Sequence, residues 1–150
     1  MKAFPHEYAV DVSGSPLGDL EVQAAGLPVL LAAPPVEFDG PGNRWSPETL
    51  LLAAVANCFV LTFRAVAGRM ELPWASMLCG VRGTVDRHER LAQFTEVTIH
   101  TQLMLLPGTS GDLAKRALEK SKDGCVIANS LKAVSRLEID IETVAFPQTA

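Results

Sequence analysis

One apolar segment, residues 46–68, limits what this chain can fold into more than any other feature. Ser46-Pro47-Glu48 carries three helix-start signals: a capping serine, a proline at the first helical position and a carboxylate in the first turn. The predicted helix runs to about Gly68, roughly 23 residues or about 34 Å. Its apolar side chains cover most of the circumference: Leu50, Leu51, Ala54, Val55, Cys58, Phe59, Thr62, Phe63 and Val66. Because 150 residues can scarcely surround such a helix, a second copy of the chain is the expected cover.

Composition favours a soluble globular protein. Hydrophobic residues make up 48 % and charged residues 20 %, which is too apolar for a disordered chain. The net charge is −4, without the basic stripe typical of nucleic-acid binders. The longest apolar run, Leu50–Val60, contains Asn57 and falls short of the roughly 18 residues of a membrane span. With no apolar signal segment at the N-terminus, the sequence predicts one cytoplasmic domain, residues 1–150, that binds neither nucleic acid nor membrane.

The hydrophobic patterns predict an α+β fold of order βββ-α-ββ-αα-β, with antiparallel sheets packed on the long central helix. A stretch bounded by prolines and glycines, residues 34–42, is expected to be a loop that cannot be helical. Gly124 suits the C-terminal cap of the first later helix. The expected strands cover 6–13, 19–24, 28–32, 79–85, 94–105 and 133–144, and the later helices cover 112–122 and 125–131.

Three cysteines, Cys58, Cys79 and Cys125, are too few and too scattered for a disulfide scaffold or a structural zinc site. Any of them can be a small core residue, which is the commoner role for a buried cysteine. Cys125 carries the stronger sign of chemistry, because it begins a short helix after two lysines, and both features favour a thiolate. Cys79 lies in an alternating strand and is expected to fill the core. The three histidines show no metal-ligand spacing, so no metal site is expected.

Pro47-Glu48, Cys58 and Cys125 at their observed spacings resemble the signature of the OsmC/Ohr family, named for osmotically inducible protein C and organic hydroperoxide resistance protein. A Pro-Glu helix start leads, ten residues on, to a cysteine within an apolar helix. The later segment Lys120-Ser-Lys-Asp-Gly-Cys125-Val-Ile-Ala-Asn-Ser-Leu is similar to the family's second-cysteine segment. The hairpin order and the closing strand agree, so the resemblance covers nearly the whole chain.

The resemblance implies an intertwined homodimer and a thiol-dependent peroxidase that reduces organic hydroperoxides in oxidative-stress defence, without a cofactor. It implies that Cys58 attacks the peroxide as a thiolate and that the resulting sulfenic acid condenses with Cys125 to a disulfide. A dithiol reductant would restore the pair by exchange. An apolar pocket around Cys58 would suit lipid-like peroxides better than hydrogen peroxide.

The sequence departs from the family at the cation that activates the thiol. Ohr-like members carry an arginine in the first β-turn, where residues 14–18 contain none. OsmC-like members carry one about ten residues before the Pro-Glu start, where this chain has Glu37-Phe38. Arg44 is the nearest replacement. A cation matters because burial alone raises a thiol pKa.

Glu48 and Cys58 are ten residues apart on one helix, about 15 Å of rise, so they cannot meet within a chain. We therefore expect a composite site, in which one chain supplies both cysteines and the other supplies Glu48 and Arg44 as a charge-assisted pair. The alternative is a non-catalytic OsmC-like dimer that binds a small ligand. In that alternative Glu48 only complements the helix dipole and Arg44 is solvated.

Overall fold

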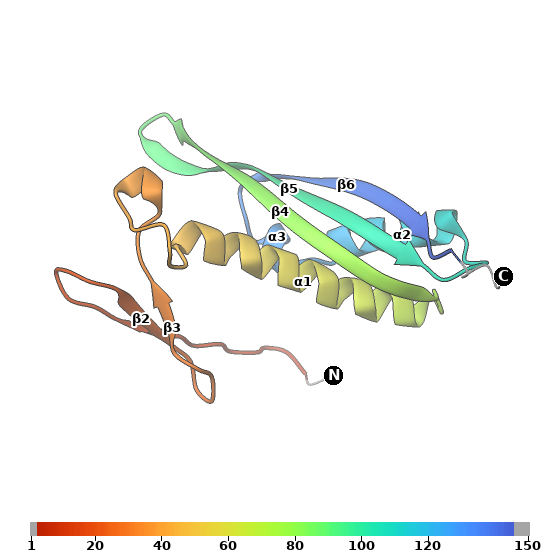
Figure 1. The fold of residues 1–150 in the computed structure, drawn as a ribbon, viewed down its shortest axis with the longest axis horizontal. Coiled ribbons are helices and arrows are strands. Elements are labelled where there is room, and N and C mark those ends of the chain that lie inside the picture. The colour runs from red at the N-terminus through yellow and green to blue at the C-terminus, as the bar shows by residue number, and fades with distance from the viewer. Residues whose placement is uncertain (1–2, 146–150) are drawn as a thin grey trace. The chain divides into compact units, whose positions relative to one another are not determined.

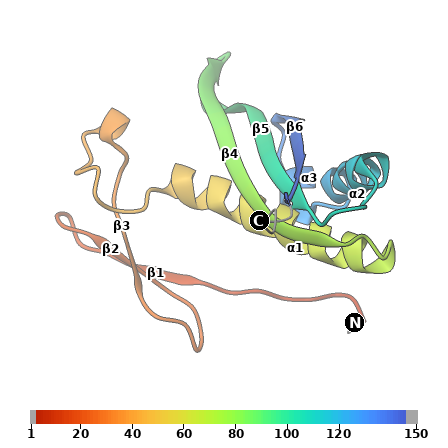
Figure 2. The ribbon, with the colours of Figure 1, turned by 45° about the vertical axis from the view of Figure 1, so that its right-hand side comes forward.

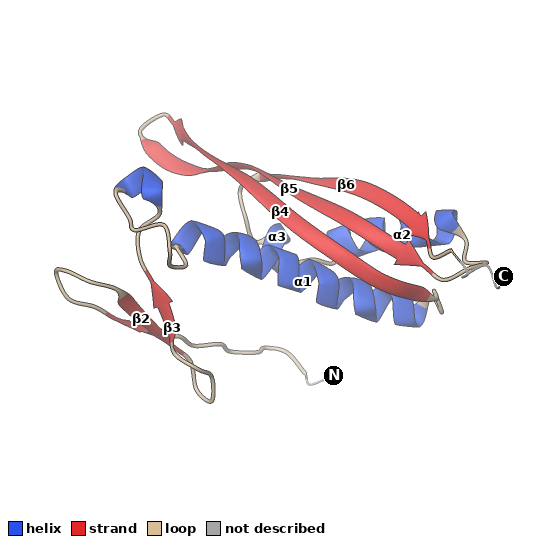
Figure 3. Ribbon diagram, in the orientation of Figure 1, coloured by secondary structure: helices blue, strands red, loops and turns tan. Residues whose placement is uncertain are grey.

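The computed structural model describes residues 3–145, apart from the side chain of His88. The chain order is the predicted one, with one added 3-10 turn, and the α+β class is confirmed (Figure 1, Figure 3). Its elements are β1 (Asp11–Ser13), β2 (Leu20–Gln23), β3 (Leu30–Ala32), η1 (Val36–Phe38), α1 (Pro47–Arg69), β4 (Trp74–His88), β5 (Leu91–Leu105), α2 (Gly111–Asp123), α3 (Val126–Asn129) and β6 (Val134–Thr143). The chain divides into two compact units after Leu51. The single domain over 1–150 stays a prediction.

In the first unit, β1, β2 and β3 form an antiparallel sheet in that order. Asp11 lies opposite Gln23, and Leu20 lies opposite Ala32. The predicted first strand was too long, because β2 has only four residues and pairs with β1 over three positions alone. Residues 6–10 alternate in hydrophobicity but are exposed, with Tyr8 91 % exposed.

The stretch 34–42 contains a short helical turn, which the sequence excluded. In η1 the Phe38 N–H donates to the Pro35 carbonyl at 2.9 Å, and Asp39 ends the turn in the left-handed region at φ 59°. The exclusion was wrong because Pro34 and Pro35 precede the turn, where no N–H is needed, and Pro41 follows its end. Gly40 is required by packing, since a Cβ there would overlap the Pro34 carbonyl oxygen.

Helix α1 begins where the sequence predicted, at a reciprocal cap. The Thr49 N–H donates to the Ser46 hydroxyl at 3.2 Å, and the Ser46 N–H donates to the Thr49 hydroxyl at 2.9 Å. Both side chains thus satisfy backbone groups at the helix start, as in a capping box. Ser46 is only 3 % exposed, so water does not serve in its place.

In the second unit, β4 and β5 form a long antiparallel hairpin, and β6 joins β5 in parallel. The prediction of antiparallel sheets is therefore wrong for this pair, which makes the second sheet mixed. The reason lies in the connection: α2 and α3 carry the chain back along the sheet, so β6 starts at the same end as β5. Leu105 is accordingly level with Thr143 at the far end of both strands.

The core of the second unit lies between this sheet and its helices (Figure 2). Alternate residues of β5, from Val97 to Leu105, are buried against α1 and α2. Helix α1 buries one face only, namely Val55, Phe59, Phe63, Val66 and Ala67. Leu61 is 59 % exposed, so the second unit by itself does not cover the helix on nearly all sides.

By length and composition, α1 could cross a membrane. The sequence analysis counted a shorter apolar run, Leu50–Val60, which is interrupted by Asn57 and flanked by Glu48 and Arg64, whereas the helix passes the length test over a longer window. The Asn57 amide donates to the Ala53 carbonyl at 2.9 Å, so its polar group is satisfied within the helix. The central helices of soluble proteins pass the same test, so this property is weak evidence for a membrane protein.

Candidate active site

Two of the predicted site residues, Cys58 and Cys125, come together in the second unit. Cys58 lies partly buried in the middle of α1, and Cys125 is fully buried at the capping residue just before α3. The two side chains are hydrogen-bonded to each other. The Cys125 sulfur also lies 3.9 Å from the Val55 carbonyl oxygen of α1. Both cysteines are free thiols in this structure.

The surroundings of Cys58 favour its thiolate. Burial is the largest single effect and raises its pKa, but four hydrogen bonds together outweigh burial and lower the pKa below the ordinary value. The donors are the Ile127 N–H, the Cys125 thiol, the Thr62 hydroxyl and the Val126 N–H. All four are neutral groups.

Cys125 has the opposite bias. Burial is the largest effect on its thiol and raises the pKa. The Ala128 N–H lowers the pKa, the neighbouring Cys58 raises it again, and the Ile127 N–H lowers it least, so the pKa lies above its ordinary value. Cys58 therefore loses its proton at lower pH than Cys125, and the Cys125 S–H can donate to the Cys58 sulfur. A thiolate beside a protonated thiol is the arrangement that a nucleophilic and a resolving cysteine require.

The third cysteine behaves as a core residue. Cys79 lies in β4 and packs against the core of the second unit. Burial, with a contribution from the charge of Cys125, raises the pKa of Cys79 to about 11. At neutral pH this thiol is protonated and is a poor nucleophile.

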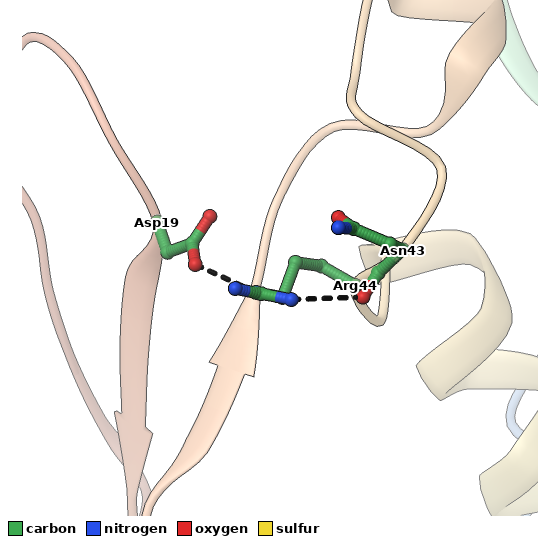
Figure 4. Close-up of polar contacts among 3 residues, drawn as sticks. All are labelled: Asp19, Asn43 and Arg44. Carbon is green, nitrogen blue, oxygen red and sulfur yellow. Dashed lines mark hydrogen bonds and ion pairs between the residues drawn. The ribbon is translucent and has the colours of Figure 1, made fainter.

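Arg44 and Glu48, the other two predicted site residues, do not pair with each other within the chain. The Arg44 Nε donates to Asp19 Oδ2 at 2.6 Å, and its Nη1 donates to the Asn43 carbonyl at 3.1 Å (Figure 4). Glu48 Oε2 is buried and has no hydrogen-bond partner among the described residues. Because α1 is continuous, Glu48 also stays about 15 Å of rise away from Cys58 along the helix.

Arg44 borders an open hollow of about 500 Å³ in the first unit. Its lining combines a guanidinium, an amide and a hydroxyl with an indole ring and a leucine: Leu31, Gly42, Asn43, Arg44, Trp45 and Thr49. Within residues 3–145, no group of three or more histidine, cysteine or carboxylate side chains is placed to hold a metal ion.

Sequence reasoning missed three contributors to these sites. The acidic partner of Arg44 is Asp19, 25 residues earlier, and no local pattern links the two. The N–H groups of Val126 and Ile127 carry no sequence signal beyond the expected start of a helix after Cys125. Thr62 does carry a signal, its i+4 spacing from Cys58, but the apolar stripe of α1 masks it.

Comparisons with known proteins agree with the fold and identify the family. The chain is 25 % identical over 109 residues to YmaD of Bacillus subtilis (strain 168). This alignment covers 71 % of the present chain and 73 % of YmaD. An OsmC-like protein from Vibrio cholerae superposes with a TM-score of 0.80 at 17 % identity, covering 93 % of this chain and 100 % of the other. An organic hydroperoxide resistance protein OsmC from Legionella pneumophila gives 0.73 at 22 % identity, covering 94 % and 99 %. The sequence model of the OsmC-like protein family matches residues 40–140, more than half of the chain, which therefore belongs to this family.

Proposed function

We propose that this protein is a cysteine-dependent peroxidase that reduces organic hydroperoxides in oxidative-stress defence. The observation that carries the proposal is the contact between a thiol biased toward ionisation, Cys58, and one biased toward protonation, Cys125. The name of the Legionella relative, an organic hydroperoxide resistance protein, supports this substrate class. The side chains beside Cys58, among them Val55 and Phe59, are apolar, and such a lining favours alkyl hydroperoxides over hydrogen peroxide.

In the first step the Cys58 thiolate attacks the outer oxygen of the hydroperoxide. The O–O bond breaks, an S–O bond forms, and the alkoxide leaves and takes a proton to become an alcohol. Cys58 is thereby oxidised to the sulfenic acid, and the peroxide is reduced. The Cys125 sulfur, as its S–H proton departs, then displaces hydroxide from the sulfenic acid. This step forms the Cys58–Cys125 disulfide and one water molecule.

Turnover requires a reductant from outside the chain. A dithiol attacks the disulfide, passes through a mixed disulfide, and leaves Cys58 and Cys125 reduced while it becomes oxidised itself. Such dithiol couples operate in reducing compartments, so we place the protein in the cytoplasm.

The proposal includes a homodimer with a shared site. The unpartnered, buried Glu48 Oε2 supports this, because a buried carboxylate oxygen without a donor is costly and suits a cation from outside the chain. In the composite site, Glu48 and Arg44 of one chain would face Cys58 of the other. Arg44 would then have to divide its donors between Glu48 and the Asp19 to which it is bound here.

Stopped-flow oxidation with cumene hydroperoxide tests the activity. We expect rapid loss of the Cys58 thiolate in the wild-type protein, slower loss with hydrogen peroxide, and none in Cys58→Ser. Catalytic consumption of the peroxide should follow when a dithiol is added. A wild-type protein that reacts with cumene hydroperoxide no faster than free cysteine would refute the peroxidase and favour the small-ligand-binding dimer.

A further inference from the structure

Thr62 lies one helical turn after Cys58, so both side chains project from the same face of α1. The Thr62 hydroxyl acts on the Cys58 thiol as a hydrogen-bond donor that lowers its pKa, and among the described groups with this effect it is the one that comes from α1 itself. The other donors, the Cys125 thiol and the N–H groups of Val126 and Ile127, all belong to the segment that begins α3. The donors that act on the Cys58 sulfur therefore come from two separate elements, α1 and the segment that begins α3.

The methyl group of Thr62 is fixed by Gly124, the residue before Cys125. A Cβ on Gly124 would lie 3.2 Å from the Thr62 Cγ2, tighter than ordinary van der Waals contact. Gly124 has φ −87°, a conformation open to any residue, so the backbone does not require glycine here. The absent side chain is therefore explained by the space that the Thr62 methyl occupies.

This contact limits the directions in which the Thr62 hydroxyl can point. In a helix, threonine divides between two χ1 rotamers, and one of them turns the hydroxyl to a backbone carbonyl of the preceding turn. Contact of the methyl with Gly124 restricts this choice, and we infer that the rotamer it favours is the one in which the hydroxyl faces Cys58.

We propose that Thr62 is a further residue of the thiol site. Its hydroxyl donates a hydrogen bond to the Cys58 thiolate, and the absence of a side chain at Gly124 allows it to do so. The titratable group that acts directly on Cys58 is Cys125, and the charge of Cys125 in turn acts on Cys79 of β4. Among the described groups of its own chain that act on Cys58, none is a charged side chain, so within one chain the thiolate is stabilised by neutral donors. The catalytic importance of this hydrogen bond rests on the proposed peroxidase function.

The test measures Cys58 without any peroxide. The rate of iodoacetamide alkylation is followed against pH, resolved for each cysteine by mass spectrometry, in the wild type, Thr62→Val and Thr62→Ser. Valine keeps the size and branching of threonine but removes the donor, whereas serine keeps the donor. Because one hydrogen bond to a charged group is lost, we expect Thr62→Val to slow alkylation of Cys58 at neutral pH about three- to tenfold and to shift its profile to higher pH. Thr62→Ser should retain most of the wild-type rate.

Thr98→Val is the matched control, because Thr98 lies between buried Val97 and Ile99 and faces away from the core. It should leave the Cys58 profile unchanged. A Thr62→Val profile within twofold of wild type, or an equal loss in Thr62→Ser, would overturn the proposal. Should the valine variant fail to fold, comparison of Thr62→Ser with Thr62→Ala isolates the same hydroxyl. If the alkylation profile shifts as expected but no variant consumes peroxide, the peroxidase fails while the role of Thr62 stands.

Discussion

The three cysteines of this chain differ in chemistry because their neighbours differ. Cys58 is partly buried and receives four hydrogen bonds, which lower its pKa. Cys125 is fully buried, and burial together with the adjacent Cys58 raises its pKa. Cys79 is dominated by burial, with a pKa of about 11. A single residue type therefore supplies a candidate nucleophile, a candidate resolving thiol and a core residue within one small region of the fold.

Oxidation by one equivalent of cumene hydroperoxide should join Cys58 to Cys125 and leave Cys79 reduced. The reason is the order of thiolate character, together with the contact between the first two sulfurs. Peptide mapping by mass spectrometry reports the pairing. In Cys125→Ser the sulfenic acid has no partner, so excess peroxide should convert Cys58 to the sulfinic acid. A disulfide that contains Cys79 would contradict these roles.

The raised pKa of Cys79 also has a consequence for stability. In the unfolded chain this thiol ionises at lower pH than in the folded protein, so its contribution is fully present below the unfolded pKa and is lost as pH rises toward about 11. Between pH 8 and 11, urea unfolding should therefore show a steeper loss of stability in the wild type than in Cys79→Ala. Equal slopes for the two proteins would show that Cys79 does not carry this effect.

At the scale of single elements, the two long helices begin with serine caps in different surroundings. Ser46, at the start of α1, is buried and exchanges hydrogen bonds with Thr49. Ser110, at the start of α2, is exposed and accepts from the Leu113 N–H at 3.3 Å. Water can replace the second cap but not the first.

Ser46→Ala should therefore destabilise the protein by about 1–2 kcal/mol, and Ser110→Ala by about 0.5 kcal/mol. Urea unfolding midpoints at an unchanged m-value measure both costs. The order of the two losses in unfolding free energy tests the argument. If Ser110→Ala destabilises the protein as much as Ser46→Ala, burial of the cap does not determine how much the cap stabilises the helix.

Local signals in the sequence were sufficient to predict most elements but not their partners. The start of α1 was predicted because the cap, proline and carboxylate at Ser46–Glu48 are adjacent in the chain. The direction of β6 was missed because an alternating apolar pattern is the same in a parallel and in an antiparallel strand. The connection through α2 and α3 determines the direction. The ion pair of Arg44 with Asp19 was missed because it joins residues 25 positions apart. The contact of Thr62 with Gly124 likewise depends on how α1 meets the segment before α3.

At the scale of the whole molecule, the exposed apolar side of α1 predicts self-association. Leu61 is 59 % exposed in the single chain, in the middle of the longest helix. Sedimentation at micromolar concentration should give about twice the 16.1 kDa of one chain. Leu61→Glu should shift the protein to monomer, because a carboxylate would be buried without a partner.

Leu78→Glu is the control for that experiment. Leu78 is 67 % exposed on β4, away from α1, and its substitution should leave the dimer intact. A wild-type protein that sediments as a stable monomer would remove the basis for a shared site.

A mixed dimer can test whether the site is shared between chains. One chain carries both Cys58→Ser and Glu48→Gln, and its partner is wild type. In a composite site, one active centre then lacks the nucleophile and the other lacks the glutamate, so activity should fall well below half of wild type. If each site lay within a single chain instead, the wild-type partner would remain fully active. Half of the wild-type activity in the purified mixed dimer would therefore refute the shared site.

The parallel pairing of β6 with β5 has a consequence for synthesis of the chain. The mixed sheet of β4, β5 and β6 is complete only after Thr143, 74 residues beyond the end of α1 at Arg69. At about 5–20 residues per second, the ribosome needs about 4 to 15 seconds to add them. During that interval the nascent chain carries a finished apolar helix whose covering layer does not yet exist. The central helix is thus the segment most prone to aggregate during synthesis. A nascent-chain chaperone should therefore bind the Pro47–Arg69 segment first.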